Sequence, residues 1–95
     1  MDKEEAYEEK WEAQLKQLRA QIDGLAAEAD QMKSEAKIEY IEGIDALKEK
    51  QEELKKKMSE LKKAGRVASE DLKVEVESAL FDLKKAVESA LLKFK

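Results

Sequence analysis

Apolar side chains recur at alternating intervals of four and three residues along most of this 95-residue chain. Such heptad spacing makes one face of an α-helix apolar and lets it pack against other helices. The first stretch consists of Trp11, Leu15, Leu18, Ile22, Leu25, Ala29, Met32 and Ala36, and the second of Ile44, Leu47, Gln51, Leu54, Met58 and Leu61. Because the chain contains no proline to interrupt it, the pattern predicts one helix over about residues 3–63.

The two stretches are joined by a change of spacing. Ala36, Tyr40 and Ile44 are separated by four and four residues, which is a stutter that locally relaxes a left-handed supercoil. Two interpretations stay open, a tolerated irregularity and a functional join. Gly24 and Gly43 have no capping residue beside them, so both are interpreted as glycines inside the helix.

One strong helix end lies at Gly65. Lys62 and Lys63, in the last turn before it, suit the negative end of a helix dipole, and glycine suits the left-handed position after a helix. Ser69 is followed by two acidic residues, as expected of an N-cap and an acidic first turn. The sequence therefore predicts a turn over about 64–69 and a second helix over about 70–94.

The C-terminal segment contains an internal repeat. Residues 71–81 and 82–92 match at eight of eleven positions, and eleven residues make three helical turns. The predicted fold is therefore all-α, a single coiled-coil domain over 1–95 in which a long helix and a shorter C-terminal helix form an asymmetric helical hairpin. In the register that places Leu72 beside Leu61, the hairpin packs through Leu54, Met58, Leu61, Leu72, Val76, Leu83 and Val87.

In such a hairpin the N-terminal half of the long helix has nothing in its own chain to pack on. Its apolar stripe then needs a second molecule, and an antiparallel two-fold dimer is the most economical solution. The sequence therefore predicts a homodimer or higher homo-oligomer, an antiparallel bundle. The residues assigned to self-association are Trp11, Leu15, Leu18, Ile22, Leu25 and Met32.

A second, smaller apolar strip lies on the opposite side of the C-terminal helix. It consists of Val74, Phe81 and Leu92, which point away from the wide apolar face. Because aligned phenylalanine and leucine side chains outside a core indicate a further contact, this strip is a candidate site for a protein partner.

Composition narrows the chemistry. The chain has no cysteine and no histidine, which excludes disulfides, the usual zinc ligand sets and nucleophiles of the Cys or Ser–His type. We therefore predict no catalytic, cofactor-binding or metal-ligating residues, no cofactor and no enzymatic activity.

Charge and hydropathy limit the classes of partner and the compartment that the sequence predicts. The 19 basic and 23 acidic side chains are interleaved, so no basic face for nucleic acid is expected. No segment approaches the roughly 18 apolar residues of a membrane span, and the acidic N-terminus lacks the apolar region of a secretion signal. A cytoplasmic protein is predicted.

Five segments resemble a family of small bacterial coiled-coil proteins, some of which are labelled stress-response proteins. These segments are Tyr7–Leu15, Ile22–Leu25, Ala36–Tyr40, Leu61–Gly65 and Glu70–Lys73. The resemblance implies a long helical hairpin that oligomerises, and it brings no catalytic residues.

Two functional hypotheses follow. The first is a non-enzymatic structural or interaction protein, a self-assembling coiled-coil rod that the resemblance links to stress response and that could also serve as an accessory subunit. The alternative is a reversible binder of lipid surfaces through the amphipathic helix 70–94. Residues 65–95 carry six basic and six acidic side chains, so this segment lacks a cationic face for anionic lipid, and a membrane surface is the less favoured partner.

Overall fold

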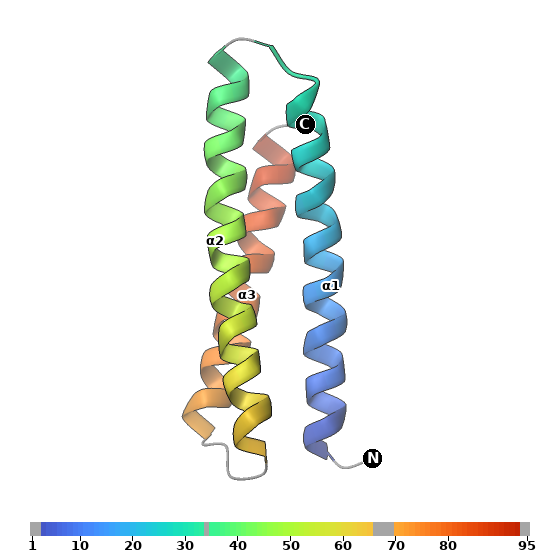
Figure 1. Ribbon diagram of the computed structural model, residues 1–95, viewed down its shortest axis with the longest axis vertical. Coiled ribbons are helices and arrows are strands. Elements are labelled where there is room, and N and C mark those ends of the chain that lie inside the picture. Colours follow the sequence, from blue (N-terminus) through green and yellow to red (C-terminus); the bar gives the residue numbers. More distant parts are fainter. Residues whose placement is uncertain (1–2, 34, 66–69, 94–95) are drawn as a thin grey trace.

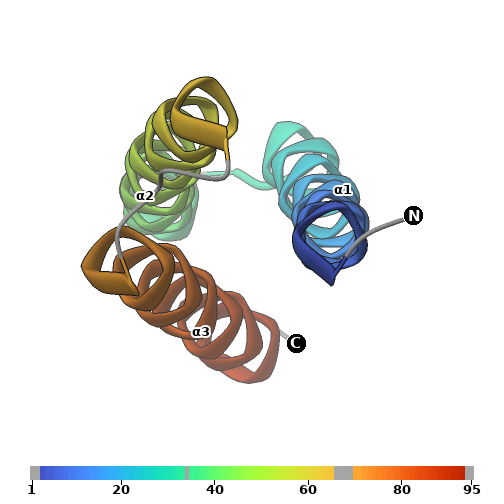
Figure 2. The ribbon, with the colours of Figure 1, turned by 90° about the horizontal axis from the view of Figure 1, so that it is seen from below.

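The chain forms a bundle of three helices. The computed structural model describes residues 3–33, 35–65 and 70–93. The helices are α1 (Lys3–Asp30), α2 (Glu35–Ala64) and α3 (Glu70–Lys93). They lie side by side in a body of 50 × 21 × 18 Å, with α2 antiparallel to α1 and α3 (Figure 1). Each helix contacts both others, at the corners of a triangle (Figure 2). The all-α prediction is confirmed over the described residues.

The prediction of one continuous helix over about 3–63 is wrong, because α1 ends at Asp30 and α2 begins at Glu35. Two backbone hydrogen bonds tighten the end of α1: the Gln31 N–H donates to the Glu28 carbonyl, and the Met32 N–H donates to the Ala29 carbonyl, each at 3.1 Å. Bonds of this i to i+3 type commonly close the last turn of a helix. The long arm of the expected hairpin is thus two helices.

This turn lets the chain bury its own apolar stripe. Leu18, Ile22 and Leu25 are at most 6% exposed, and burial of an aliphatic side chain contributes about 1.5–3 kcal/mol. Breaking a helix removes only a few backbone hydrogen bonds, each with a net value of about 0.5–1.5 kcal/mol. Folding back therefore outweighs the continuous helix, whose N-terminal half would leave the stripe in water.

The three helices share one core along the bundle. Its buried members are Trp11, Leu15, Leu18, Ile22, Leu25 and Ala29 from α1, Tyr40, Ile44, Leu47, Leu54 and Leu61 from α2, and Val76, Leu80, Leu83 and Val87 from α3. No charged side chain is buried in the part of the chain that the structure describes.

Ion pairs at the surface mark how α3 lies along α2. Lys57 Nζ is 3.6 Å from Glu75 Oε2, and Lys93 Nζ is 3.6 Å from Glu39 Oε1. The register that the sequence predicts for the two helices places both of these pairs opposite each other. The pairs lie at two different heights along the bundle. Because all four side chains are more than a third exposed, the pairs indicate alignment rather than large stabilisation. Phe94, which the same register sets near Ile38, lies outside the described residues.

A partly buried hydrogen bond joins α1 and α2 across their turn. The Tyr40 hydroxyl donates to Glu28 Oε2 at 2.8 Å, and Tyr40 is fully buried. Burial first, and then the hydrogen bond and negative charge of Glu28, raise the pKa of Tyr40 from 10.0 to about 12. The stutter at Ala36, Tyr40 and Ile44 therefore places this tyrosine in the core at the start of α2.

Two glycines give opposite expectations for substitution by alanine. Gly65 follows α2 with a φ of 60°, so Gly65→Ala is expected to lower the free energy of unfolding by about 1–2 kcal/mol. Gly24 lies inside α1 with no atom within 4 Å of an added Cβ, so Gly24→Ala is expected to raise it by about 0.5–1 kcal/mol. Urea unfolding of both variants measures whether each substitution lowers or raises the free energy of unfolding. A higher free energy of unfolding for Gly65→Ala would show that this backbone conformation does not persist in solution.

The N-cap expected at Ser69 lies outside the described residues.

Candidate interaction surface

The residues assigned to self-association lie inside the chain's own core. Trp11, Leu15, Leu18, Ile22 and Leu25 are at most 8% exposed, and the partly buried Met32 packs against them. The expectation that this stripe has nothing in its own chain to pack on is therefore wrong, because α2 and α3 cover it. The turn that the heptad pattern did not predict brings both helices to it. Any association between copies must use another surface.

The residues assigned to packing between α2 and α3 also lie in this core. The buried members are Leu54, Leu61, Val76, Leu83 and Val87, and the partly buried members are Met58 and Leu72. They are thus shared among three helices instead of two. None of them is left for binding.

The α3 strip, defined as Val74, Phe81 and Leu92, faces away from the core. These side chains are 61%, 57% and 79% exposed. Their separations of seven and eleven residues place them within about 20° of one another on an α-helix, because each residue turns it by about 100°. The strip is thus a straight apolar line along the outside of α3.

A lysine accompanies the aromatic ring of the strip. Lys85 Nζ lies 4.9 Å from the ring centroid of Phe81, within the range of a cation–π interaction. Lys85 is one helical turn after Phe81 and is itself exposed. The positive charge of the Lys85 ammonium group therefore lies over the face of the Phe81 ring.

A groove runs along the outside of the bundle between α1 and α3. It consists of two adjoining hollows that share Gln14, Leu80 and Lys84 in their linings. Its apolar floor includes Trp11, Leu18 and Leu80, which are 5–7% exposed. We call it the α1–α3 groove. Phe81 of the α3 strip lines it as well, so the strip meets the groove at this residue, whereas Val74 borders a hollow against Glu53 and Lys57 of α2.

The α1 rim of this groove is an uncharged line of amides. Gln14, Gln17 and Gln21 line it at helical spacing, with Lys10 near one end. α1 contains eight acidic and four basic residues, yet none of its carboxylates lines the groove. None of these three glutamines is among the residues that the apolar pattern assigns to an interface. Their spacing of three and four residues in a strongly charged segment is the signal that could have found them.

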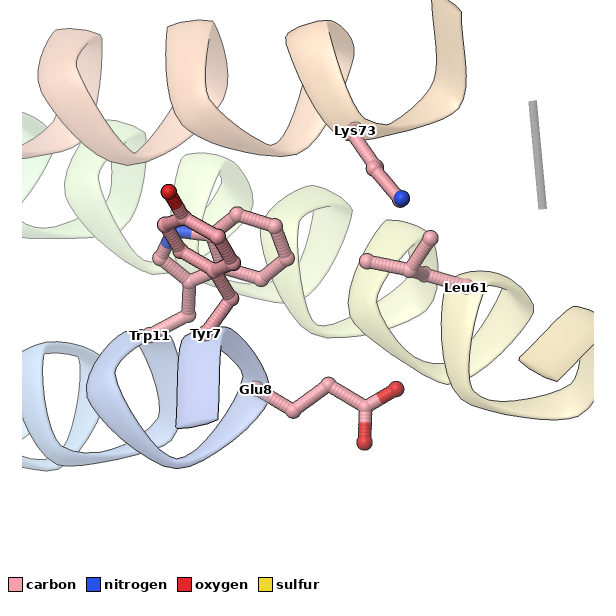
Figure 3. A pocket seen from close by; sticks show the side chains of 5 residues that line it. All are labelled: Tyr7, Glu8, Trp11, Leu61 and Lys73. Atoms are coloured by element: carbon pink, nitrogen blue, oxygen red, sulfur yellow. The ribbon is translucent and has the colours of Figure 1, made fainter. Parts of the chain in front are cut away.

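A small cavity lies near one end of the bundle, between α1, α2 and α3 (Figure 3). Its wall includes Tyr7 stacked on Trp11, with ring centroids 5.8 Å apart and planes inclined by 28°. Lys73 and Leu61 close the other side. The cavity holds about 20 Å³, which is room for a single water molecule and too little for a small-molecule ligand.

The described residues contain neither a metal-binding cluster nor a membrane-spanning helix. Within residues 3–33, 35–65 and 70–93, no three His, Cys, Asp or Glu side chains are grouped as a metal site requires. None of the helices described there has the length and apolar content needed to cross a membrane.

Comparison of the chain with protein-family models, curated proteins and solved structures found no match. The resemblance to small bacterial coiled-coil proteins therefore stays a prediction.

Proposed function

We propose that this chain is a non-enzymatic interaction protein that binds a helix of another protein chain through the α3 strip. The observation that carries this proposal is the exposure of Val74, Phe81 and Leu92 on a bundle whose core is already closed by other residues. Because the fold does not need these side chains inside, their alignment on one surface indicates a second contact. The link to stress response rests on the sequence resemblance alone.

The shape of the strip favours a helical partner. Val74 and Leu92 are 18 residues apart, roughly 27 Å at 1.5 Å per residue and five full turns. A straight line of side chains of this length matches the ridge of another helix, and it fits neither a compact ligand nor a short extended peptide. The strip and the adjoining α1–α3 groove together offer apolar contact with a polar rim, as protein interfaces do.

Site-specific photocrosslinking tests this proposal. A benzophenone amino acid in place of Phe81 is expected to give a discrete protein adduct in cells that express the chain. The matched control carries the same group in place of Glu49, which is exposed on α2 and lies outside the strip and groove. Equal labelling from the two positions, or none from Phe81, would contradict the proposal.

Lipid binding through the apolar face of α3 would require α3 to separate from the other two helices. The wide apolar face of α3 is buried through Val76, Leu80, Leu83 and Val87, so lipid could reach it only after that core is lost. α3 also carries six acidic and four basic residues, which disfavours anionic membranes. In flotation with anionic and neutral vesicles the chain is expected to stay with the unbound fraction. Flotation accompanied by loss of the folded core would favour the lipid function instead.

A further inference from the structure

We infer that the partner on this surface is a second copy of the chain, docked antiparallel so that α3 packs against the partner's α3 and α1 against the partner's α1. This inference rests on the proposed function and names its partner. It uses the face formed by the α3 strip and the α1–α3 groove, on the outside of the closed bundle.

Four residues on the exposed side of α3 are spaced symmetrically along the helix. With Lys85 included, the line is Val74, Phe81, Lys85 and Leu92, with intervals of seven, four and seven residues. In an antiparallel pair about a two-fold axis at Leu83, Val74 meets the partner's Leu92, and Phe81 meets the partner's Lys85. Each contact joins chemically matched groups, apolar with apolar and cation with aromatic ring. The 4.9 Å approach of Lys85 to Phe81 within one chain shows that the two groups suit each other.

The rim of α1 is self-complementary as well. Gln14 and Gln21 are symmetric about a point between Gln17 and Leu18, so an antiparallel copy sets Gln14 opposite the partner's Gln21. A glutamine amide both donates and accepts hydrogen bonds, so two identical rows can bond to each other. Rows of identical charge could not do so.

Both centres of symmetry lie at the same height in the bundle. α1 and α3 are parallel, and the groove sets the segment from Gln14 to Gln21 across from the segment from Leu80 to Glu88. The midpoint of the first, between Gln17 and Leu18, therefore lies beside the midpoint of the second, Lys84, which adjoins Leu83. One two-fold axis thus serves both helices, which is the condition for an isologous dimer.

The charge and size of the face also suit a second copy. The whole chain has a net charge of −4, so two copies repel each other on average. The charged residues lining the groove cancel, with Lys10 and Lys84 against Glu77 and Glu88. The bundle measures 50 × 21 × 18 Å, so a long face spans roughly 900–1,050 Å², which is comparable with the ~800 Å² per partner of a standard interface.

Sedimentation of the purified chain tests the inference. The parent is expected to sediment as a dimer, with twice its 10.9 kDa mass, at a concentration of roughly 100 µM. This concentration lies above the micromolar dissociation constants of the weakest interfaces of this size. Val74→Glu alone and Leu92→Lys alone are each expected to weaken the dimer at least about tenfold, because each places an unpaired charge against an apolar side chain. The variant carrying both changes is expected to recover, since the antiparallel register brings the two new charges together across the interface.

Controls separate docking from folding and from the broader proposal. Val74 and Leu92 are exposed, so circular dichroism is expected to show unchanged helicity in all variants, and Glu49→Lys on α2 is expected to leave the mass unchanged. A monomeric parent, or a dimer that the double variant does not restore, overturns the antiparallel pairing. If the parent is monomeric while the benzophenone at Phe81 still captures a different protein, the proposed function stands and the second copy is excluded.

Discussion

Replacing Leu83 with alanine is expected to lower the free energy of unfolding by about 2–5 kcal/mol, the range for leucine truncations that leave a cavity in a packed core. Leu83 is fully buried in the core shared by the three helices. For a chain of this size each kcal/mol corresponds to a change in Tm of about 4–8 °C, so the loss is expected to be visible in a thermal melt as well as in urea.

The matched control is Leu92→Ala, the same substitution on the same helix. Leu92 is 79% exposed, and surface substitutions of this kind usually change stability by less than about 0.5 kcal/mol. Both variants are measured below the concentration at which copies associate, so that only the fold is compared. Equal losses from the two variants would contradict the placement of α3 in the bundle.

The second large effect is a loss of stability at high pH that depends on Tyr40. Its pKa is raised from 10.0 to about 12 by burial and by Glu28, so between these values the folded chain keeps a proton that the unfolded chain has released. The stabilisation is complete below pH 10 and is lost as the pH rises to about 12. A shift of about two pKa units corresponds to at most about 2–3 kcal/mol, because the hydrogen bond to Glu28 is only partly buried and solvent screens it.

Tyr40→Phe isolates this effect, because every other titrating group is common to both proteins. At neutral pH the variant is expected to be less stable than the parent by about 0.5–1.5 kcal/mol, the net value of one hydrogen bond. As the pH approaches 12 the parent loses more than this, so the order of stability is expected to reverse. Urea midpoints measured across this pH range are the readout. Parallel pH profiles for the two proteins would mean that Tyr40 is not buried against Glu28.

The identity of the core could be predicted from the sequence because helical periodicity is a local property. Spacing alone predicts that Trp11, Leu15 and Ile22 form one apolar stripe that must be covered. They are buried, although by the chain's own helices and not by the second molecule that the sequence predicts. The same periodicity predicts that Phe81 and Leu92 lie outside the apolar face of α3, and both are exposed. Gly65 was likewise identified as a helix end from its neighbours, and its φ of 60° fits that role.

The turn after α1 was missed because its local signals are weak. No glycine or proline lies between Asp30 and Glu35, and the apolar spacing continues through Met32 to Ala36. The available signal was Ser34 before Glu35, the same pair as Ser69 before Glu70 at the start of α3. It competes with an unbroken heptad pattern, and the pattern favours a continuous helix.

The sequence by itself therefore determined that the chain is helical, which side chains each helix hides and which it leaves outside. The tertiary structure decided which molecule covers the stripe of α1. A heptad stripe specifies that a face must be buried, and it is equally satisfied by a second copy or by α2 and α3 of the same chain. The choice depends on the free energy of the long-range contacts around residues such as Ile22 and Leu54, weighed against the few backbone hydrogen bonds lost where the helix breaks between α1 and α2. No local pattern encodes that balance.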